Sequence, residues 1–399
     1  MSLFKSAALL VAVPPAIYLA ILSLLIALPV VQNHVFYLHW LPLASLPHLN
    51  IPEVFGFLRG QVTPFSIDTA DGETLHAWHV LPLGIYQRHQ QELLAEPSGF
   101  TADIQSKLGF QLLRDDPEAR LVVFLHGTAG CIASGWRPDS YRALSSTSPD
   151  KIHVLTADYR GYGLSTGTPS EEGLLLDTIA IVDWAMNTAG IPPSRIVIFG
   201  QSLGTAVAIS LLHHFSSQSP PTMFSGTVLV AAFSDVATLT STYRIGGVIP
   251  VLSPLSTIPP LLSFFTSYLR NTWPSKDRVA DFIRRSEIGD AGSRKYHLTF
   301  IHAADDATIG HAHSDVMFWH AVNASTSAGI AFAELEREKG VRKRDLGEGG
   351  WVVDWETPAG SSIGLLLLRY GVHDRLMAYP ATAMAVLQAF RAGDAGFER

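Results

Sequence analysis

Short apolar segments alternate with helical patterns over most of the chain. A hairpin is predicted first, because the turn dipeptide Asp71-Gly72 lies between two strand-like runs in residues 65–82. Continuous apolar runs of strand length follow, and they indicate parallel strands that are buried on both faces. These runs are residues 121–126, 152–157, 195–199, 227–232, 298–302 and 364–370. The alternation predicts an α/β fold, with a mainly parallel sheet flanked by helices.

The clearest helical pattern begins after Ser170. We expect Ser170 to be the N-cap, because its hydroxyl can accept a hydrogen bond from a free amide of the first helical turn. Glu171 and Glu172 come next, where the helix dipole favours negative charge. The pattern continues through Trp184 and ends at Gly190, a residue type that commonly terminates helices.

The amino-terminal apolar run, residues 7–31, carries no charge over 25 positions. A helix of that length can cross a membrane. Pro14 and Pro15 lie early in the run, and we expect them to kink the helix. A cleaved signal peptide is the alternative interpretation of the same segment.

The charges around this run predict its orientation and the domain plan. Lys5 precedes the run, so the positive-inside rule places residues 1–6 in the cytosol and the catalytic part in the lumen. Residues 32–64 are expected to be a linker. Residues 65–399 are expected to form one domain.

Composition narrows the chemistry. The net charge of −7 offers no basic surface for nucleic acid. Cys131 is the single cysteine, which excludes an intramolecular disulfide and argues against a cysteine zinc site. His311, His313 and Asp315 lie close in sequence but lack further metal ligands, so no metal and no other cofactor is predicted. No particular protein partner is predicted.

A nucleophile elbow is predicted at Ser202. The pentapeptide Gly200-Gln201-Ser202-Leu203-Gly204 follows an apolar strand-like run and precedes a helical pattern. A G-x-S-x-G sequence in that position forms a sharp turn that presents the serine oxygen at the edge of the sheet. We therefore expect Ser202 to be the nucleophile.

An oxyanion hole is predicted beside this serine. The run at residues 121–125 ends in His126-Gly127-Thr128-Ala129-Gly130. A His-Gly after this strand supplies one oxyanion donor in sheets of this kind, and the residue after the nucleophile supplies the other. The donors should be the backbone amides of Thr128 and Leu203. His126 itself is expected to be structural.

The acid and the base are expected after the serine, in that order. The apolar run that ends at residue 302 leads to Asp305 and Asp306, and we choose Asp306 because it falls deeper in the turn. The last strand-like run leads to His373, the only histidine after His320. His373 would take the proton from the serine, and Asp306 would fix its tautomer.

Two insertions are predicted around the acid. Residues 236–296 are expected to form a helical cap, and residues 307–362 a long insertion before the histidine. Residues 245–269 of the cap are uncharged but are broken by prolines, so a second membrane span is not expected. Short apolar helices there would line an acyl-chain channel or dip into a membrane surface. The alternative is a cap packed wholly on its own core.

Several stretches together carry a family resemblance. They are Asp71-Gly72-Glu73, residues 77–82, 126–130 and 158–163, Gly167-Thr168-Pro169-Ser170, Asp183-Trp184, and residues 200–204 and 302–306. With these, the chain resembles the membrane-anchored α/β-hydrolases grouped with lysophosphatidylserine lipase and monoacylglycerol lipase, the α/β-hydrolase domain-containing type 12 group.

The resemblance implies an α/β-hydrolase fold with Ser202, Asp306 and His373 as catalytic triad. It implies an endoplasmic reticulum membrane, a lumenal active site, and hydrolysis of a lysophospholipid or monoacylglycerol ester. The substrate would be a lipid ester and the membrane a partner. Two other functions stay open: a protein depalmitoylase or acyl-thioesterase, and a catalytically idle membrane scaffold or receptor on the same fold.

Overall fold

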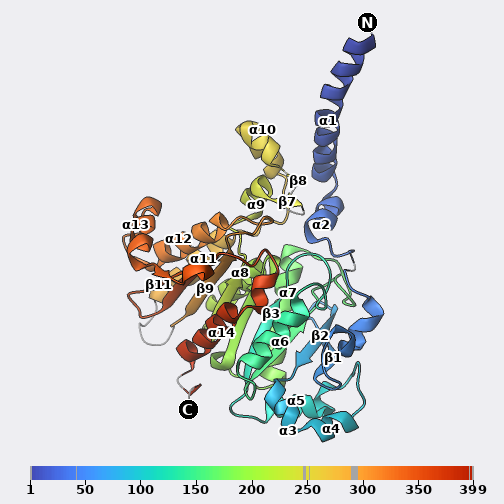
Figure 1. The fold of residues 1–399 in the computed structure, drawn as a ribbon, viewed down its shortest axis with the longest axis vertical. Helices are drawn as coiled ribbons and strands as arrows, with labels where there is room; N and C mark the ends of the chain where they lie inside the picture. The colour runs from blue at the N-terminus through green and yellow to red at the C-terminus, as the bar shows by residue number, and fades with distance from the viewer. Residues whose placement is uncertain are drawn as a thin grey trace.

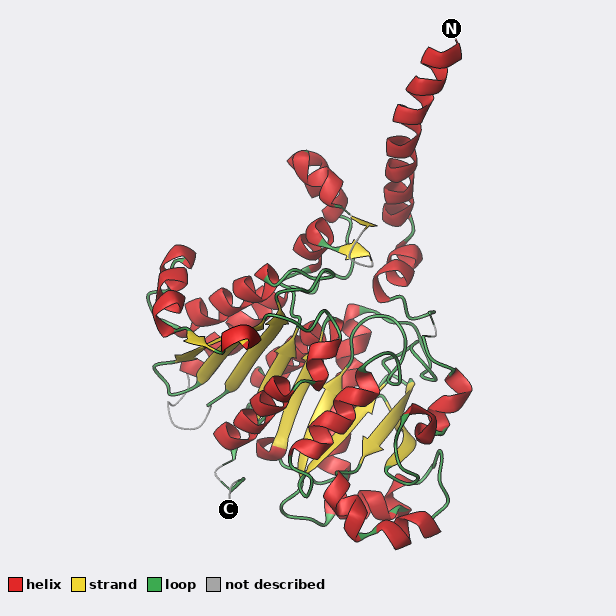
Figure 2. Cartoon of the chain, viewed as in Figure 1, coloured by secondary structure: helices red, strands yellow, loops and turns green. Residues whose placement is uncertain are grey.

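The computed structural model describes residues 2–41, 43–245, 249–250, 252–288, 295–394 and 396–397. Within these ranges a ten-stranded sheet has the order β1-β2-β4-β3-β5-β6-β9-β12-β11-β10 (Figures 1 and 2). Its strands are β1 Val62–Asp68, β2 Thr74–Val80, β3 Arg120–Leu125, β4 Ile152–Ala157, β5 Ile196–Gln201, β6 Gly226–Val230, β9 His297–Ala303, β10 Arg344–Asp345, β11 Gly350–Glu356 and β12 Ser362–Leu368.

The six central strands, from β4 to β12, are parallel to one another. They coincide within a few residues with the six apolar runs, so the predicted parallel sheet is confirmed. The predicted hairpin is β1 and β2, which pair antiparallel around Gly72 and join the sheet antiparallel to β4.

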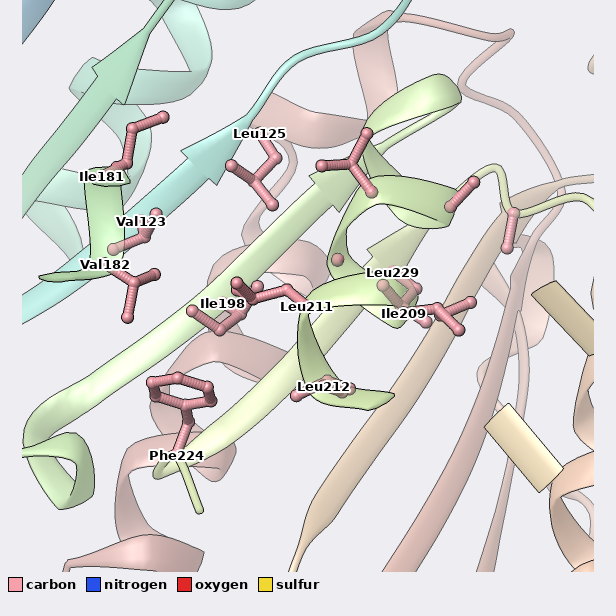
Figure 3. Packing of buried hydrophobic residues seen from close by; sticks show 14 of the residues in the cluster. Val123, Leu125, Ile181, Val182, Ile198, Ile209, Leu211, Leu212, Phe224 and Leu229 are labelled. Atoms are coloured by element: carbon pink, nitrogen blue, oxygen red, sulfur yellow. The ribbon is translucent and has the colours of Figure 1, made fainter. Parts of the chain in front are cut away.

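Helices cover both faces of this sheet. One core cluster joins the sheet to α7 (Glu171–Asp183), α8 (Leu203–Ser216), α11 (Ser275–Ile288) and α12 (Ala312–Ser325). Figure 3 shows sheet residues of this cluster, such as Val123 and Ile198, beside Leu211 and Ile181 of the covering helices. A second cluster joins the opposite face to α6 (Arg137–Thr147) and α14 (Pro380–Gly393). Alternate residues of β3 contribute to the two clusters, as the period of a strand requires.

The predicted N-cap is present. Ser170 Oγ accepts a hydrogen bond from the Gly173 amide at 3.0 Å, and α7 begins at the next residue. A π-helical turn, Trp184–Thr188, continues α7. Gly190 follows with a φ of +69°, which ends the helical run as expected.

The expected cap and insertion are divided differently in the structure. In residues 236–296, α9 (Val236–Thr242), the short pair β7 (Arg244–Ile245) and β8 (Ile249–Pro250), the 3₁₀ helix Ser253–Thr257 and α10 (Pro259–Thr266) project from the sheet. Helix α11 instead belongs to the layer on the sheet, because its Val279 and Phe282 are buried in the core cluster. Residues 236–274 are called the cap below, and its Val236, Leu239 and Trp273 also belong to the core cluster.

Residues 307–362, the expected long insertion before the histidine, contain elements that pack on the sheet or join it. Helix α12 covers the sheet, with Met317 and Val322 in the core. Helix α13 (Phe332–Arg342) follows, and the strands β10 and β11 then extend the sheet antiparallel beyond β12. The segment therefore widens the sheet.

The amino terminus differs from the single helix expected over residues 7–31. It forms α1 (Ser2–Ala27), which continues through Pro14 and Pro15, and α2 (Pro29–Tyr37). The break falls at Leu28, which is extended because a residue before proline is disfavoured in helical conformation. Among the described residues, no helix alone is long and apolar enough to cross a membrane. The stretches Val13–Leu25 and Val30–Tyr37 are bent by 107° relative to each other. Taken as a pair, they have the length and the apolar composition of a membrane span.

The expected linker is partly folded onto the domain. Two 3₁₀ helices, Leu46–Asn50 and Pro52–Phe55, precede β1. Leu49 and Phe57 are buried in the second core cluster, and the Leu49 carbonyl accepts a hydrogen bond from Trp78 Nε1 at 2.9 Å. The sheet begins at Val62, three residues before the boundary expected from the sequence.

Candidate active site

Ser202 lies in the turn between β5 and α8, at the carboxyl edge of the sheet. Its φ of 53° and ψ of −119° are strained for a residue with a side chain. The turn is closed by contact with its neighbours: a Cβ added at Gly204 would stand 2.0 Å from the Leu125 carbonyl oxygen. The Ser202 amide donates to the Val230 carbonyl at 2.9 Å, and the residue is 5% exposed. Strand, sharp turn and helix are the surroundings that a nucleophile elbow requires.

Asp306 is held in one orientation at the end of β9. One carboxylate oxygen, Oδ1, accepts the amides of Thr308 at 2.8 Å and Ile309 at 3.0 Å. The other, Oδ2, lies 3.3 Å from His302 Nε2. Burial raises the pKa of Asp306, but the hydrogen bonds from His302 and His373 outweigh it, and the net shift is downward. The carboxylate is therefore ionised and fixed before any substrate arrives.

His373 donates from Nδ1 to Oδ2 of Asp306 at 2.7 Å. Burial lowers the pKa of His373, but the hydrogen bond to Asp306 and its charge raise it, and the net shift is upward. With the proton on Nδ1, the neutral ring keeps its lone pair on Nε2, as a general base must. Gln201 links this loop to the elbow, because its Nε2 donates to Asp374 Oδ1 at 3.1 Å.

The structure separates the two candidate acids. Asp305 is exposed, and its Oδ1 accepts the Val372 amide at 2.8 Å. It supports the backbone of the loop that carries His373, whereas Asp306 contacts the imidazole. The carboxylate chosen from the sequence is thus the one beside the ring.

The oxyanion loop, residues 127–130, follows β3 and lies against the elbow. A Cβ added at Gly127 would stand 2.3 Å from Gln201 Oε1 and 3.1 Å from Ser202 Cβ, so only glycine fits there without a shift. Within the described part of the chain, the amides of Thr128 and Leu203 donate to no backbone or side-chain acceptor. Both amides therefore remain without an acceptor among the described residues, as donors reserved for a bound group would.

Arg137 orients this loop, a role that no sequence motif indicated. Its guanidinium Nη2 donates to the carbonyls of Gly127, Thr128 and Ala129 at 3.0, 3.1 and 3.0 Å. A trans peptide points its carbonyl and its amide in opposite directions. The carbonyl of Gly127 faces Arg137, so the amide of Thr128 points away from it.

The remaining polar groups beneath the loop are structural. His126 is fully buried, with Nδ1 2.8 Å from the Gly127 carbonyl, and burial holds its pKa well below the usual value. Burial raises the pKa of the neighbouring Asp158 to about 7, and its Oδ1 accepts the Ile132 amide at 2.7 Å. Cys131 is buried, and burial raises the pKa of its thiol to about 11, which suits a packing residue.

No group of three potential metal ligands occurs among the described residues. His311 Nδ1 lies 3.2 Å from Asp315, but His313 is turned toward Ser234 and Thr242 instead. His311 and His313 therefore point to different protein partners and do not converge on one point.

A family model described as "Alpha/beta hydrolase family" matches residues 122–392. The lysophosphatidylserine lipase ABHD12 of Rattus norvegicus is 30% identical over 207 residues, 51% of this chain and 46% of that protein. That of Danio rerio is 28% identical over 205 residues, 51% and 48% of the two chains. Protein ABHD12B of Homo sapiens is 32% identical over 189 residues, 47% and 46%. The chain spans about half the length of the curated relatives it matches.

Among solved structures, the fold is similar to an alpha-beta hydrolase from Vibrio vulnificus. The TM-score is 0.55 at 12% sequence identity, covering 90% of this chain and 93% of that one. At this identity the likeness concerns the fold alone.

Proposed function

Because this chain belongs to the alpha/beta hydrolase family, we propose that it is a serine esterase that cleaves carboxylic esters of lipids through an acyl-enzyme. Ser202 is the proposed nucleophile, His373 the base and Asp306 the acid that orients it. One observation carries the proposal: the 2.7 Å hydrogen bond between His373 and Asp306, on a loop tied through Gln201 to the strained elbow.

The proposed reaction has two steps. His373 Nε2 takes the proton from Ser202 Oγ as the oxygen attacks the ester carbonyl carbon. The amides of Thr128 and Leu203 stabilise the oxyanion, and the tetrahedral intermediate expels the alcohol, which leaves with the proton from His373. A water molecule, deprotonated by the same nitrogen, then hydrolyses the acyl-enzyme. Asp306 stabilises the imidazolium in both steps.

A lipid substrate is favoured by an apolar cluster between α1 and the cap and by the names of the relatives. Leu22 of α1 forms a small apolar cluster with Leu252, Leu255 and Phe265 of the cap. Helices α1 and α10 extend to the same side of the molecule (Figure 1). We propose a lysophospholipid or a monoacylglycerol as the substrate, because the curated relatives are lysophosphatidylserine lipases.

A membrane location belongs to the same proposal. Many apolar side chains of α1 and α2 are exposed, among them Ile17, Ile21, Leu24 and Val30. Patches of this extent mark interaction surfaces, and the occupant we propose is the lipid bilayer. Lys5 and the family resemblance favour the endoplasmic reticulum, with the catalytic part on the lumenal side.

The proposed activity is tested with purified full-length protein in detergent. We expect covalent labelling by a fluorophosphonate and release of fatty acid from lysophosphatidylserine, other lysophospholipids or monoacylglycerol. Faster cleavage of an acyl-thioester than of the matching ester would favour the depalmitoylase alternative. A protein that neither labels nor hydrolyses any of these would support the idle scaffold.

The membrane contact of the cap is tested by polar substitution. Ile258, Phe264 and Tyr268 are 52%, 52% and 46% exposed on the cap. Replacing all three with serine should lower turnover of a long-chain ester in liposomes by roughly tenfold, because each methylene inserted into lipid contributes about 0.8 kcal/mol. Turnover of a short soluble ester should change little.

The control is Val341→Ser on α13, which removes an apolar side chain that is 84% exposed and lies outside the cap. It should affect neither substrate. Equal turnover of liposomal ester by the triple variant and the control would show that the cap makes no useful membrane contact.

A further inference from the structure

The carboxyl end of α2 is hydrogen-bonded to the oxyanion loop. The last carbonyls of a helix have no partner inside it, and those of Phe36 and Tyr37 find theirs in this loop. Thr128 Oγ1 lies 2.9 Å from the Phe36 oxygen and 2.7 Å from the Tyr37 oxygen. The Ala129 amide also donates to the Tyr37 oxygen, at 3.0 Å. A segment about ninety residues earlier in the chain is therefore part of the loop's immediate support.

These contacts hold a peptide plane next to the proposed oxyanion donor. In the peptide between Thr128 and Ala129, the carbonyl accepts from Arg137 and the amide donates to Tyr37. The plane is fixed from both sides, and Ala129 keeps a left-handed φ of 61°. The preceding peptide carries the Thr128 amide, so its direction depends on this fixed neighbour.

Helix α2 is held in place by the burial of Tyr37 and by hydrogen bonds with its neighbours. Tyr37 is fully buried in the main core cluster, and its carbonyl also accepts from Tyr162 Oη at 2.7 Å. Asn33 donates to the Pro169 carbonyl at 3.2 Å and accepts from Asn271 Nδ2 at 2.8 Å.

The same helix also contacts the cap. Gln32 donates to the Tyr268 carbonyl at 3.0 Å and accepts the Arg270 amide at 3.2 Å. Helix α2 thus touches the oxyanion loop, Pro169 just before α7, and the irregular segment 268–271 of the cap.

We propose that α2 is a positioning element of the oxyanion hole, which holds the loop in the conformation that presents the Thr128 amide to the reacting carbonyl. The inference builds on the proposed function and adds its dependence on the amino-terminal segment. Only Leu28 separates α1 from α2. A change in the position of α1 should therefore be transmitted through α2 to the oxyanion loop. Loosening the contact should lower turnover even of a soluble substrate that never meets a membrane.

The test removes the side-chain contact while keeping the backbone amide. Thr128→Val in the full-length protein replaces the hydroxyl with a methyl of similar volume. We expect kcat on a short soluble ester to fall roughly 10- to 100-fold, since misplacing one group by about 1 Å can cost 10²-fold. KM should change by less than about threefold, because the loop acts on the transition state rather than on ground-state binding.

Three comparisons make the result specific. Thr128→Ser restores the hydroxyl and should recover most of the lost kcat. Thr147→Val removes a comparable hydroxyl, bound to the Ala143 carbonyl at 2.8 Å in α6, and should leave kcat unchanged. Asn33→Ala loosens α2 without touching the loop and should lower kcat several-fold. Hydrogen exchange at the Ala129 amide should quicken in both Thr128→Val and Asn33→Ala.

The outcomes separate the two proposals. A wild-type protein without Ser202-dependent hydrolysis would overturn the proposed function. An active wild type with Thr128→Val as fast as it, or with Thr128→Ser as slow as Thr128→Val, would overturn the positioning role alone. If Thr128→Val does not fold, an unchanged kcat and unchanged exchange in Asn33→Ala overturn it instead.

Discussion

Ser202→Ala is expected to abolish ester hydrolysis, with a loss on the order of 10⁴ or more in kcat. The variant retains the oxyanion amides and the His373–Asp306 pair but has no oxygen to form the acyl-enzyme. Residual turnover can come only from the oxyanion hole and from binding. Hydrolysis of a short ester by purified protein, with fluorophosphonate labelling in parallel, measures the effect.

The fold should survive this change. Ser202 is held by its backbone amide and by the turn geometry, and alanine supplies the same Cβ. A melting temperature within a few degrees of wild type is therefore expected. Ser216→Ala is a matched control at the far end of α8, where the hydroxyl donates to the His213 carbonyl at 3.0 Å. Hydrolysis retained by purified Ser202→Ala would remove the nucleophile assignment.

The central sheet and the elbow could be predicted because their signals are local. Each buried parallel strand appears in the sequence as a continuous apolar run, and Asp71-Gly72 marks the hairpin between β1 and β2. The G-x-S-x-G sequence needs only the strand before it and the helix after it. Ser170 is a further example, since an N-cap is decided within three residues.

The edges of the fold could not be predicted in the same way. The sequence predicts one cap over residues 236–296, because the segment is long and its residues 245–269 are apolar and broken by prolines. Helix α11 joins the core through a stripe that includes Val279 and Phe282, and only its place beside α8 and α12 reveals this. The break in the amino-terminal helix falls at Leu28, whereas the kink was expected at Pro14 and Pro15.

The supports of the oxyanion loop also had no sequence signal. Arg137 is an ordinary residue at the start of a helix, and its importance comes from three carbonyls that face it. The contact between Thr128 and Tyr37 joins segments 91 residues apart. Contacts of this kind are decided by tertiary packing, and a short sequence motif carries no information about them.

The choice between Asp305 and Asp306 could be predicted from the sequence only in part. The sequence placed two adjacent carboxylates after the strand, and depth in the turn favoured the second. The structure adds two amides, those of Thr308 and Ile309, that anchor the Asp306 carboxylate toward His373. Asp305 instead accepts a hydrogen bond from the Val372 amide, in the loop that carries His373.

Asp306→Asn is accordingly expected to lower kcat by about 10⁴, while Asp305→Asn lowers it by less than about tenfold. An amide at Oδ2 would donate toward Nδ1 of His373 and favour the tautomer with the proton on Nε2, which cannot act as base. The pH profile should move as well. The charge of Asp306 opposes the lowering effect of burial and holds the pKa of His373 above its usual value. Without it the imidazolium is less stable, so the acid limb of kcat/KM should shift to lower pH.

Asp305→Asn is the matched control for that shift, because it removes a neighbouring charge without touching the imidazole. Its acid limb should stay close to that of wild type. Rates and pH profiles of the two purified variants on one short ester show which of the two aspartates orients His373. A larger loss in Asp305→Asn than in Asp306→Asn, or an acid limb that moves upward in Asp306→Asn, would mean that another group orients His373. The contact at 2.7 Å would then be structural.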